Sequence, residues 1–269
     1  MKIGNREFDV NNDTYVMGIL NVTPDSFSDG GKFNNLEAAL AHTEEMIKEG
    51  ATIIDVGGES TRPGGYTLIS DEEEIGRVVP VIRAIKEKFD IPVSIDTYKS
   101  KVAKAAIAAG ADLVNDIWGL KYDKNMAKVI ADAGVACCLM HNRDNMEYTS
   151  FMDDMLADLR ETIQLAKEAG IADDKIMLDP GVGFAKSYEN NLEAIQKVGR
   201  LHELGYPVLL GTSRKSVIGL TLDTTKDERV EGTLVTTVFG VQQGCAFVRV
   251  HDVKENYEAL MMAKAILNA

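Results

Sequence analysis

The chain has 269 residues, of which 45% are hydrophobic and 26% are charged, and its formal net charge at pH 7 is -13. This length suits one α/β barrel, and the even mixture of apolar and charged residues excludes a disordered chain. Because no cluster of Lys and Arg interrupts the acidic composition, we expect no nucleic-acid partner.

The sequence also has no pattern that is typical of export or of membrane insertion. Its first residues lack an apolar signal core, and no apolar stretch approaches the ~20 residues that cross a bilayer. The three cysteines, Cys137, Cys138 and Cys245, show no zinc-like spacing, so we interpret them as small buried side chains. We therefore expect a cytoplasmic protein without membrane association.

Eight short apolar runs recur along the chain. They are rich in Val, Ile and Leu and show no polar alternation, which is the pattern of strands covered on both faces in a parallel sheet. The predicted strands span residues 15–20, 52–56, 92–95, 112–114, 135–140, 175–178, 207–210 and 246–250.

Longer amphipathic segments separate these runs. In the first, residues 36–49, Leu40, Thr43 and Ile47 fall on one helical stripe, and Gly50 marks the end. The other predicted helices span residues 73–89, 99–109, 124–133, 153–169, 188–204, 229–243 and 255–267. Eight strand–helix units predict a single-domain (β/α)8 TIM barrel over residues 1–269, with an open doubly wound sheet as the alternative.

Polar residues follow the predicted strands, where each strand ends. They include Asn21, Asp55, Asp96, Asn115, His141, Asp179, Lys215, Arg249 and His251. A single Asp or Asn here is explained by a turn or a helix cap, but capping has no use for Lys215, Arg249 or His251. Because the strand ends of a barrel meet at one mouth, the sequence predicts an active site there, beside two long loops at 22–35 and 57–71.

The motifs of several enzyme classes are absent from the sequence. The sequence has no Gly-x-Ser-x-Gly elbow, no Walker A loop, no Gly-x-Gly-x-x-Gly and no His-x-x-x-His zinc spacing. Lys215 remains a candidate Schiff-base lysine, as in barrel aldolases.

Two long segments carry a specific resemblance to a known family. Residues 17–31, MGILNVTPDSFSDGG, and residues 55–64, DVGGESTRPG, are similar to the first two signatures of the dihydropteroate synthases. Shorter motifs follow in the family's order at residues 94–97, 114–116, 178–184, 213–216 and 249–253. The resemblance covers nearly the whole chain, although the segment 141–146, HNRDNM, is more polar than we expect for this family.

The resemblance implies an enzyme of folate biosynthesis. Members of the family join 4-aminobenzoate to 6-hydroxymethyl-7,8-dihydropterin pyrophosphate and release pyrophosphate and 7,8-dihydropteroate. They are (β/α)8 barrels, use Mg²⁺, are targets of sulfonamides and usually form homodimers. We expect the same fold, cofactor, substrates and assembly here.

The resemblance also assigns residues to the pterin. Asp179 would accept the two parallel N–H donors of the 2-amino-4-oxo end, and Lys215 would donate to the ring oxygen and N5. Arg249 would lie flat over the ring with its edge toward the phosphates. The implied catalytic residues are Asp96, Lys215 and Arg249. The implied pterin-binding residues are Asp96, Asn115, Ile117, Met140, Asp179, Phe184, Gly211, Lys215 and Arg249.

Two further regions are implied for the other reacting groups. The pyrophosphate-binding residues are Asn21, Arg62, Arg249 and His251, with Asn21 as the Mg²⁺ ligand. The aminobenzoate-binding residues are Phe27, Thr61, Arg62, Pro63, Lys215 and Ser216. The aminobenzoate carboxylate would lie near Ser216, at the start of the helix after the seventh strand.

We expect an SN1-like reaction, in which the C–O bond to pyrophosphate breaks first. The attacking aniline is neutral at pH 7 and needs little help from a base, while nearby carboxylate charge would stabilise the pterin cation. The alternatives are a pterin-dependent corrinoid methyltransferase, a non-catalytic paralogue that only binds pterin, and a barrel aldolase that uses Lys215. The first needs neither the Asn21 loop nor the loop that holds Thr61, Arg62 and Pro63.

Overall fold

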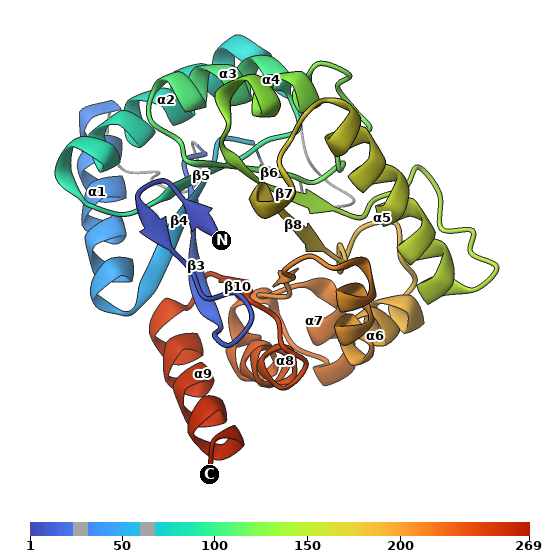
Figure 1. Ribbon diagram of the computed structural model, residues 1–269. Coiled ribbons are helices and arrows are strands. Elements are labelled where there is room, and N and C mark those ends of the chain that lie inside the picture. Colours follow the sequence, from blue (N-terminus) through green and yellow to red (C-terminus); the bar gives the residue numbers. More distant parts are fainter. Residues whose placement is uncertain (24–31, 60–67) are drawn as a thin grey trace.

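Eight parallel strands form the centre of the computed structural model, which describes residues 1–23, 32–59 and 68–269 (Figure 1). They are neighbours in the order β8-β7-β6-β5-β4-β3-β10-β9. The strands are β3 (Tyr15–Asn21), β4 (Ala51–Gly57), β5 (Val93–Asp96), β6 (Leu113–Asp116), β7 (Ala136–Met140), β8 (Ile176–Asp179), β9 (Leu209–Leu210) and β10 (Phe247–Val250).

The two ends of this sheet meet between β8 and β9. Leu178 of β8 forms a parallel bridge to Val208, which directly precedes β9. The first and last of the eight strands pair as well, with Phe247 of β10 opposite Tyr15 of β3. The sheet is therefore a closed barrel, which confirms the predicted single-domain (β/α)8 TIM barrel, and the open-sheet alternative is wrong.

Helices surround the barrel on its outside (Figure 1). They are α1 (Lys32–Lys48), α2 (Asp71–Lys88), α3 (Ser100–Ala108), α4 (Met126–Ala133), α5 (Phe151–Glu168), α6 (Tyr188–Gln196), α7 (Ser216–Leu222), α8 (Val230–Gln242) and α9 (Val253–Leu267). Each presents an apolar face to the strands; Ile82 of α2 and Leu159 of α5, for example, are completely buried. Across the described ranges, no helix combines the length and apolar character that a membrane span requires.

The observed helices and strands differ from the predicted ones mainly around the seventh predicted strand. The strand expected at 207–210 is shortened to β9, and the helix expected at 188–204 is divided into α6 and the 3-10 segment η3 (Val198–Leu204). The division falls at Lys197, whose φ of -113° lies outside the helical range. Helix α7 is missing from the helices predicted by periodicity, because seven residues are too few to show a helical period, but the family resemblance implied a helix that begins near Ser216, where α7 starts.

An N-terminal hairpin covers the bottom of the barrel, which is the end at which the strands begin. Its two strands, β1 (Lys2–Ile3) and β2 (Arg6–Glu7), are antiparallel and lie across the barrel opening in Figure 1. Ile3 and Phe8 are buried against the inward side chains Met17 and Phe247. This apolar cluster fills the interior of the barrel at the end where the strands begin.

The inward side chains of the barrel change from apolar to polar along the strands. Side chains alternate between the two faces of a strand, so a residue two positions later points the same way. Met17, Ile53, Cys138, Met177 and Phe247 belong to the buried cluster at the bottom. Two residues further along the same strands stand Ile19, Asp55, Met140, Asp179 and Arg249. The predicted packing role of the cysteines is confirmed, since Cys137, Cys138 and Cys245 are all buried and unpaired.

Candidate active site

A cavity of about 560 Å³ lies at the C-terminal ends of the barrel strands. Its lining includes every residue predicted to bind the pterin. Those residues are Asp96, Asn115, Ile117, Met140, Asp179, Phe184, Gly211, Lys215 and Arg249. Asn21, His251 and Ser216, which were predicted for the other two regions, line the same cavity. The structure thus brings together predicted residues from distant parts of the chain.

A guanidinium joins two carboxylates at the centre of this cavity. Arg249 donates from Nε to Oδ2 of Asp55 and from Nη2 to Oδ2 of Asp96, each over 2.6 Å. Asn115 donates from Nδ2 to the same Asp55 oxygen over 3.3 Å. Burial raises the pKa of Asp96 to about 7, although the charge of Arg249 acts in the opposite direction.

Asp179 presents a carboxylate to the cavity from the end of β8. Its Oδ1 accepts a hydrogen bond from the backbone N–H of Gly181 over 2.6 Å. A methyl group added at Gly211 would lie 3.5 Å from its Oδ2, so the glycine leaves this edge of the carboxylate uncovered. Burial raises the pKa of Asp179, and the Lys215 charge opposes the rise.

Lys215 faces Asp179 across the cavity wall. Its Nζ donates to the carbonyl oxygen of Val182 and lies 5.0 Å from the centre of the Phe184 ring. Burial lowers the pKa of this amine to about 8, while the Asp179 charge favours the protonated form. The ammonium is therefore held between a carboxylate and an aromatic face, and two of its three donors remain for a ligand.

Apolar side chains form the wall between these polar edges. Ile117 and Met140 are buried in one cluster with Tyr98, and Phe184 and Trp118 pack against that cluster. A flat ring fits such a space, because its faces meet apolar side chains while its edges reach carboxylates, an amide and an ammonium.

The other end of the cavity is suited to an anion. Nδ1 of His251 lies 3.0 Å from the hydroxyl oxygen of Ser213, and this oxygen also accepts the backbone N–H of His251 over 3.1 Å. Because Nδ1 contacts Ser213, Nε2 is the ring nitrogen that remains for a ligand. Burial lowers the pKa of His251 to about 3, so the ring is neutral at pH 7.

Asn21 completes this end from the last position of β3. A methyl group at Gly57 would lie 3.6 Å from Oδ1 of Asn21 and 3.7 Å from Oδ2 of Asp96. The amide oxygen and the carboxylate therefore approach the same small glycine from two strands.

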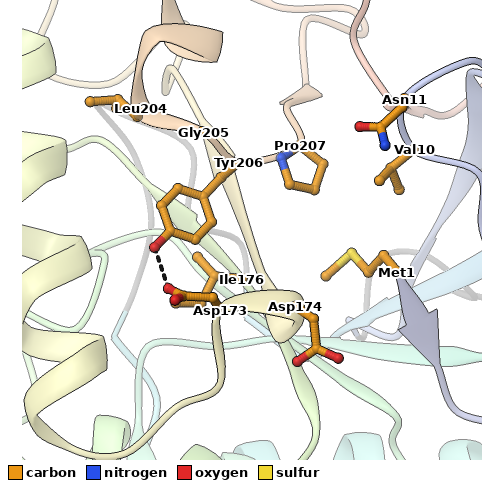
Figure 2. A pocket seen from close by; sticks show the side chains of 10 residues that line it. All are labelled: Met1, Val10, Asn11, Asp173, Asp174, Ile176, Leu204, Gly205, Tyr206 and Pro207. Atoms are coloured by element: carbon orange, nitrogen blue, oxygen red, sulfur yellow. Dashed lines mark hydrogen bonds between the residues drawn. The ribbon is translucent and has the colours of Figure 1, made fainter.

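A second cavity, of about 430 Å³, lies at the opposite end of the barrel (Figure 2). It is lined by Met1 and Val10 on one side and by Tyr206 and Pro207 on the other, and the Tyr206 hydroxyl donates to Asp173. None of the polar strand ends contributes to it. The chemistry therefore belongs to the cavity at the C-terminal ends of the strands.

The chain is similar to known proteins in both sequence and fold. Residues 17–251 match the family model described as "Pterin binding enzyme". The dihydropteroate synthase of Clostridium beijerinckii is 63% identical over 99% of both chains. The chain belongs to the dihydropteroate synthase family.

Solved structures of the family agree with the geometry. The crystal structure of dihydropteroate synthase from Clostridium difficile in the presence of pteroic acid is 51% identical, with a TM-score of 0.94 over 98% of this chain and 100% of that one. The Xanthomonas albilineans dihydropteroate synthase with 4-aminobenzoic acid is 41% identical, with a TM-score of 0.91 over 96% and 94% of the two chains. Dihydropteroate synthesis, a transferase reaction of folate biosynthesis, is therefore the function of this chain, as the motifs predicted.

Four predicted residues of this dihydropteroate synthase lie outside the described residues. They are Phe27 of the first long loop and Thr61, Arg62 and Pro63 of the second. Their roles toward aminobenzoate and pyrophosphate stay predictions.

The structure adds residues that the sequence did not single out as ligand-binding. Asp55 was noted only as a strand end, yet its completely buried carboxylate holds both Arg249 and Asn115. Glu59 lines the cavity and accepts hydrogen bonds from Tyr98 over 2.6 Å and from the buried Lys99. A carboxylate inside an apolar strand was the available signal for Asp55, because such a group needs a buried partner.

Arg214, Lys226 and Arg229 also line the cavity, next to Ser216. Arg214 pairs with Asp252 through two donors, and Arg229 donates to the backbone oxygen of Arg214 over 2.9 Å. No sequence signal separates them from other surface cations, since the fold alone brings them to this wall.

Proposed function

We propose that this cavity joins 6-hydroxymethyl-7,8-dihydropterin pyrophosphate to 4-aminobenzoate, with the pterin ring in the space between Asp179 and Asp96. The observation that carries this assignment is the uncovered Oδ2 edge of Asp179 beside Gly211, opposite the Asp96 and Asn115 edge and between apolar walls. A buried carboxylate edge of this kind matches two parallel N–H donors, such as those of a 2-amino-4-oxo ring.

Each edge of the pterin then meets a complementary group. Asp179 accepts the two N–H donors, and Lys215 donates to the ring oxygen and N5 with the donors that Val182 does not use. Asp96 and Asn115 meet the opposite edge. Ile117, Met140 and Phe184 cover the ring faces, and Arg249 lies over the ring beside its two carboxylates.

The pyrophosphate lies at the end of the cavity formed by Asn21, Arg249 and His251. Arg249 keeps unused N–H donors after its two bonds to carboxylates, and neutral His251 offers Nε2–H. Arg62, outside the described residues, is proposed to add a further cation. These groups bind the charge that grows on the leaving oxygen as the C–O bond breaks.

Asn21 would hold Mg²⁺ together with pyrophosphate oxygens and water. Within the described parts of the chain, no group of three or more His, Cys, Asp and Glu side chains could hold a metal. One neutral amide oxygen fits Mg²⁺ when phosphates and waters complete its shell. When bound, Mg²⁺ neutralises charge on the leaving pyrophosphate.

We propose that bond breaking precedes attack. The C–O electron pair leaves with pyrophosphate, the pterin methylene becomes cationic, and the aniline nitrogen then forms the new C–N bond and releases a proton. Ionised Asp96 stabilises the cation through its charge. A neutral aniline carries its own lone pair, so no protein base is required for the attack.

The aminobenzoate is assigned to the wall that Lys215 and Ser216 form at the start of α7. The neighbouring cations Lys226 and Arg229 favour its carboxylate at this wall. Phe27, Thr61, Arg62 and Pro63 are proposed to border it from the two long loops. The solved relative with 4-aminobenzoic acid supports the choice of this substrate.

We further propose a homodimer that forms through α7, α8 and α9. These helices expose large apolar side chains: Leu220, Leu222, Val235, Phe239, Met261, Met262 and Ile266. Exposed apolar surface of this kind marks an interaction site, and a second copy would cover it. A cytoplasmic location is proposed as well, supported by three unpaired, buried cysteines.

One assay tests the proposed function. The purified protein is mixed with Mg²⁺, the pterin pyrophosphate and 4-aminobenzoate, and 7,8-dihydropteroate and pyrophosphate are measured. Equal molar formation of both products is expected. Release of pyrophosphate without dihydropteroate, or no reaction, would contradict the proposal.

A further inference from the structure

Two loops beside the pterin site are joined by a buried chain of polar groups. Asp158 of α5 accepts from His141 at Nε2 over 2.9 Å, and His141 meets Nζ of Lys186 at Nδ1 over 3.0 Å. Lys186 also donates to the carbonyl oxygen of Phe184 over 3.0 Å. The chain of contacts therefore runs from the segment after β7 to the loop after β8, which carries a wall of the pterin site.

The protonation of this chain follows from its partners. His141 is 2% exposed and Lys186 is 7% exposed, so both polar groups depend on partners in the protein. A carboxylate only accepts, so His141 donates Nε2–H to Asp158, and its Nδ1 is left to accept from Lys186. Burial lowers the pKa of Lys186 to about 7. Burial lowers the pKa of His141 to about 4, which keeps the ring in this neutral form at pH 7.

The loop held in this way has an unfavourable backbone. Gly181, Ala185 and Gly183 have φ values of 68°, 44° and 89°, and Ala185 is not a glycine. Such left-handed conformations persist when surrounding contacts hold them. The Tyr148 hydroxyl supplies one more of these contacts, because it donates to the Ala185 carbonyl oxygen over 2.8 Å.

The same loop is held from its other side by the pterin site itself. Lys215 donates to the Val182 carbonyl oxygen, while Lys186 donates to that of Phe184. A shift of the loop would therefore move the aromatic wall and the acceptor of Lys215 together.

We propose that Lys186, with His141 and Tyr148, is a positioning residue that sets the Val182–Phe184 segment for pterin binding. This inference deepens the proposed function and rests on it. It also supplies a role for His141 in the polar segment that follows β7. Lys186 acts through Phe184 and Lys215, and it does not itself line the cavity.

The test compares Lys186→Met and Tyr148→Phe with the control Lys197→Met. Lys197 is an exposed lysine at the end of α6 that pairs with Glu193 over 2.8 Å, far from any role in this chain of contacts. The dissociation constant for 6-hydroxymethylpterin is measured by calorimetry, and the KM for each substrate is measured kinetically. Circular dichroism and the melting temperature report the fold.

We expect Lys186→Met to raise the pterin Kd and the KM for the pterin pyrophosphate about tenfold or more, because the buried contacts of Lys186 with His141 and with the Phe184 carbonyl oxygen are lost. The aminobenzoate KM should change less, by under about threefold, because Lys215 is the one described group of that wall that contacts this loop, while Ser216, Lys226 and Arg229 belong to other segments. Tyr148→Phe should shift the pterin constants in the same direction by less, and Lys197→Met should leave them unchanged.

A wild-type pterin Kd in folded Lys186→Met would overturn the proposal, as would an equal loss of affinity for both substrates. If Lys186→Met does not fold, Tyr148→Phe decides, because it retains the ion pairs and removes one hydroxyl. A wild-type enzyme that makes no dihydropteroate would contradict the proposed function instead, while the pterin Kd of the variants would still test the positioning role.

Discussion

Arg249 donates from Nη2 to Oδ2 of Asp96 over 2.6 Å, and this contact ties the last barrel strand, β10, to β5. The second donor, Nε, reaches Asp55 of β4 at the same distance. The guanidinium is thus fixed in direction before any substrate binds, and a planar group with several donors is required to make both contacts.

Replacing Arg249 with Lys is therefore expected to reduce the activity strongly. A lysine has the charge but cannot reach Asp55, Asp96 and a phosphate at once, so kcat/KM should fall by about 100-fold, or roughly 2.7 kcal/mol. Steady-state kinetics with both substrates would measure this loss. A loss below about fivefold would mean that charge alone suffices at this position.

The pH dependence of kcat/KM should report the protonation of Asp96 and of Lys215. Burial raises the pKa of Asp96 to about 7, so acidification below that value protonates it and removes the charge that favours the cation. Burial lowers the pKa of Lys215 to about 8, so raising the pH above that value removes its proton. We expect a bell-shaped profile of kcat/KM with its maximum between these values.

The acidic side of this profile can be assigned through binding. Asp96→Asn retains the size of the side chain and cannot titrate, so the pterin Kd of this variant should lose its dependence on pH below about 7. Calorimetry at several pH values would measure it. An unchanged dependence would assign the acidic limb to another group, such as Glu74, whose pKa is raised by burial.

A single added methyl group should separate pterin binding from folding. In Gly211→Ala, the new carbon would lie 3.5 Å from Oδ2 of Asp179 and 3.9 Å from Nζ of Lys215, at ordinary contact distances. Stability should therefore change little, whereas the KM for the pterin pyrophosphate should rise about tenfold because the methyl group occupies the ring edge. Gly76→Ala, where a methyl group meets nothing within 4 Å, is the matched control.

The sequence indicated which polar strand ends meet in one cavity, but it did not indicate the contacts that support this cavity. Asp96, Asn115 and Asp179 could be found because polar residues at the ends of apolar strands converge in any barrel. Lys186 could not be found, since an isolated lysine before a helix is usually exposed, and only the fold brings it to His141. The N-terminal hairpin escaped prediction as well, because two-residue strands carry no periodicity.

A substitution in the apolar cluster beneath the N-terminal hairpin should change the stability of the protein without changing its activity. Phe8 of the N-terminal segment is 4% exposed and packs edge-to-face on Tyr15 at 4.9 Å between ring centres. Phe8→Ala should lower the free energy of unfolding by about 3 kcal/mol. Because the active site lies at the opposite end, kcat below the melting transition should match the wild type. Denaturant unfolding would measure the free energy of unfolding, and kinetics at room temperature would measure kcat. A large loss of kcat in the folded variant would show that this apolar cluster influences the active site.

The proposed Mg²⁺ ligand can be tested by comparing metal dependence with pterin binding. In Asn21→Ala, the Mg²⁺ concentration for half-maximal activity should rise about tenfold, because an oxygen ligand is lost from the pyrophosphate end. Affinity for 6-hydroxymethylpterin, which lacks pyrophosphate, should stay within about twofold of the wild type, since the proposed role of Asn21 is toward pyrophosphate and its metal ion and not toward the ring. Removal of Mg²⁺ by a chelator should reduce turnover of the wild type and be reversed by adding the ion back. Equal Mg²⁺ dependence in wild type and Asn21→Ala would place the ion on other groups.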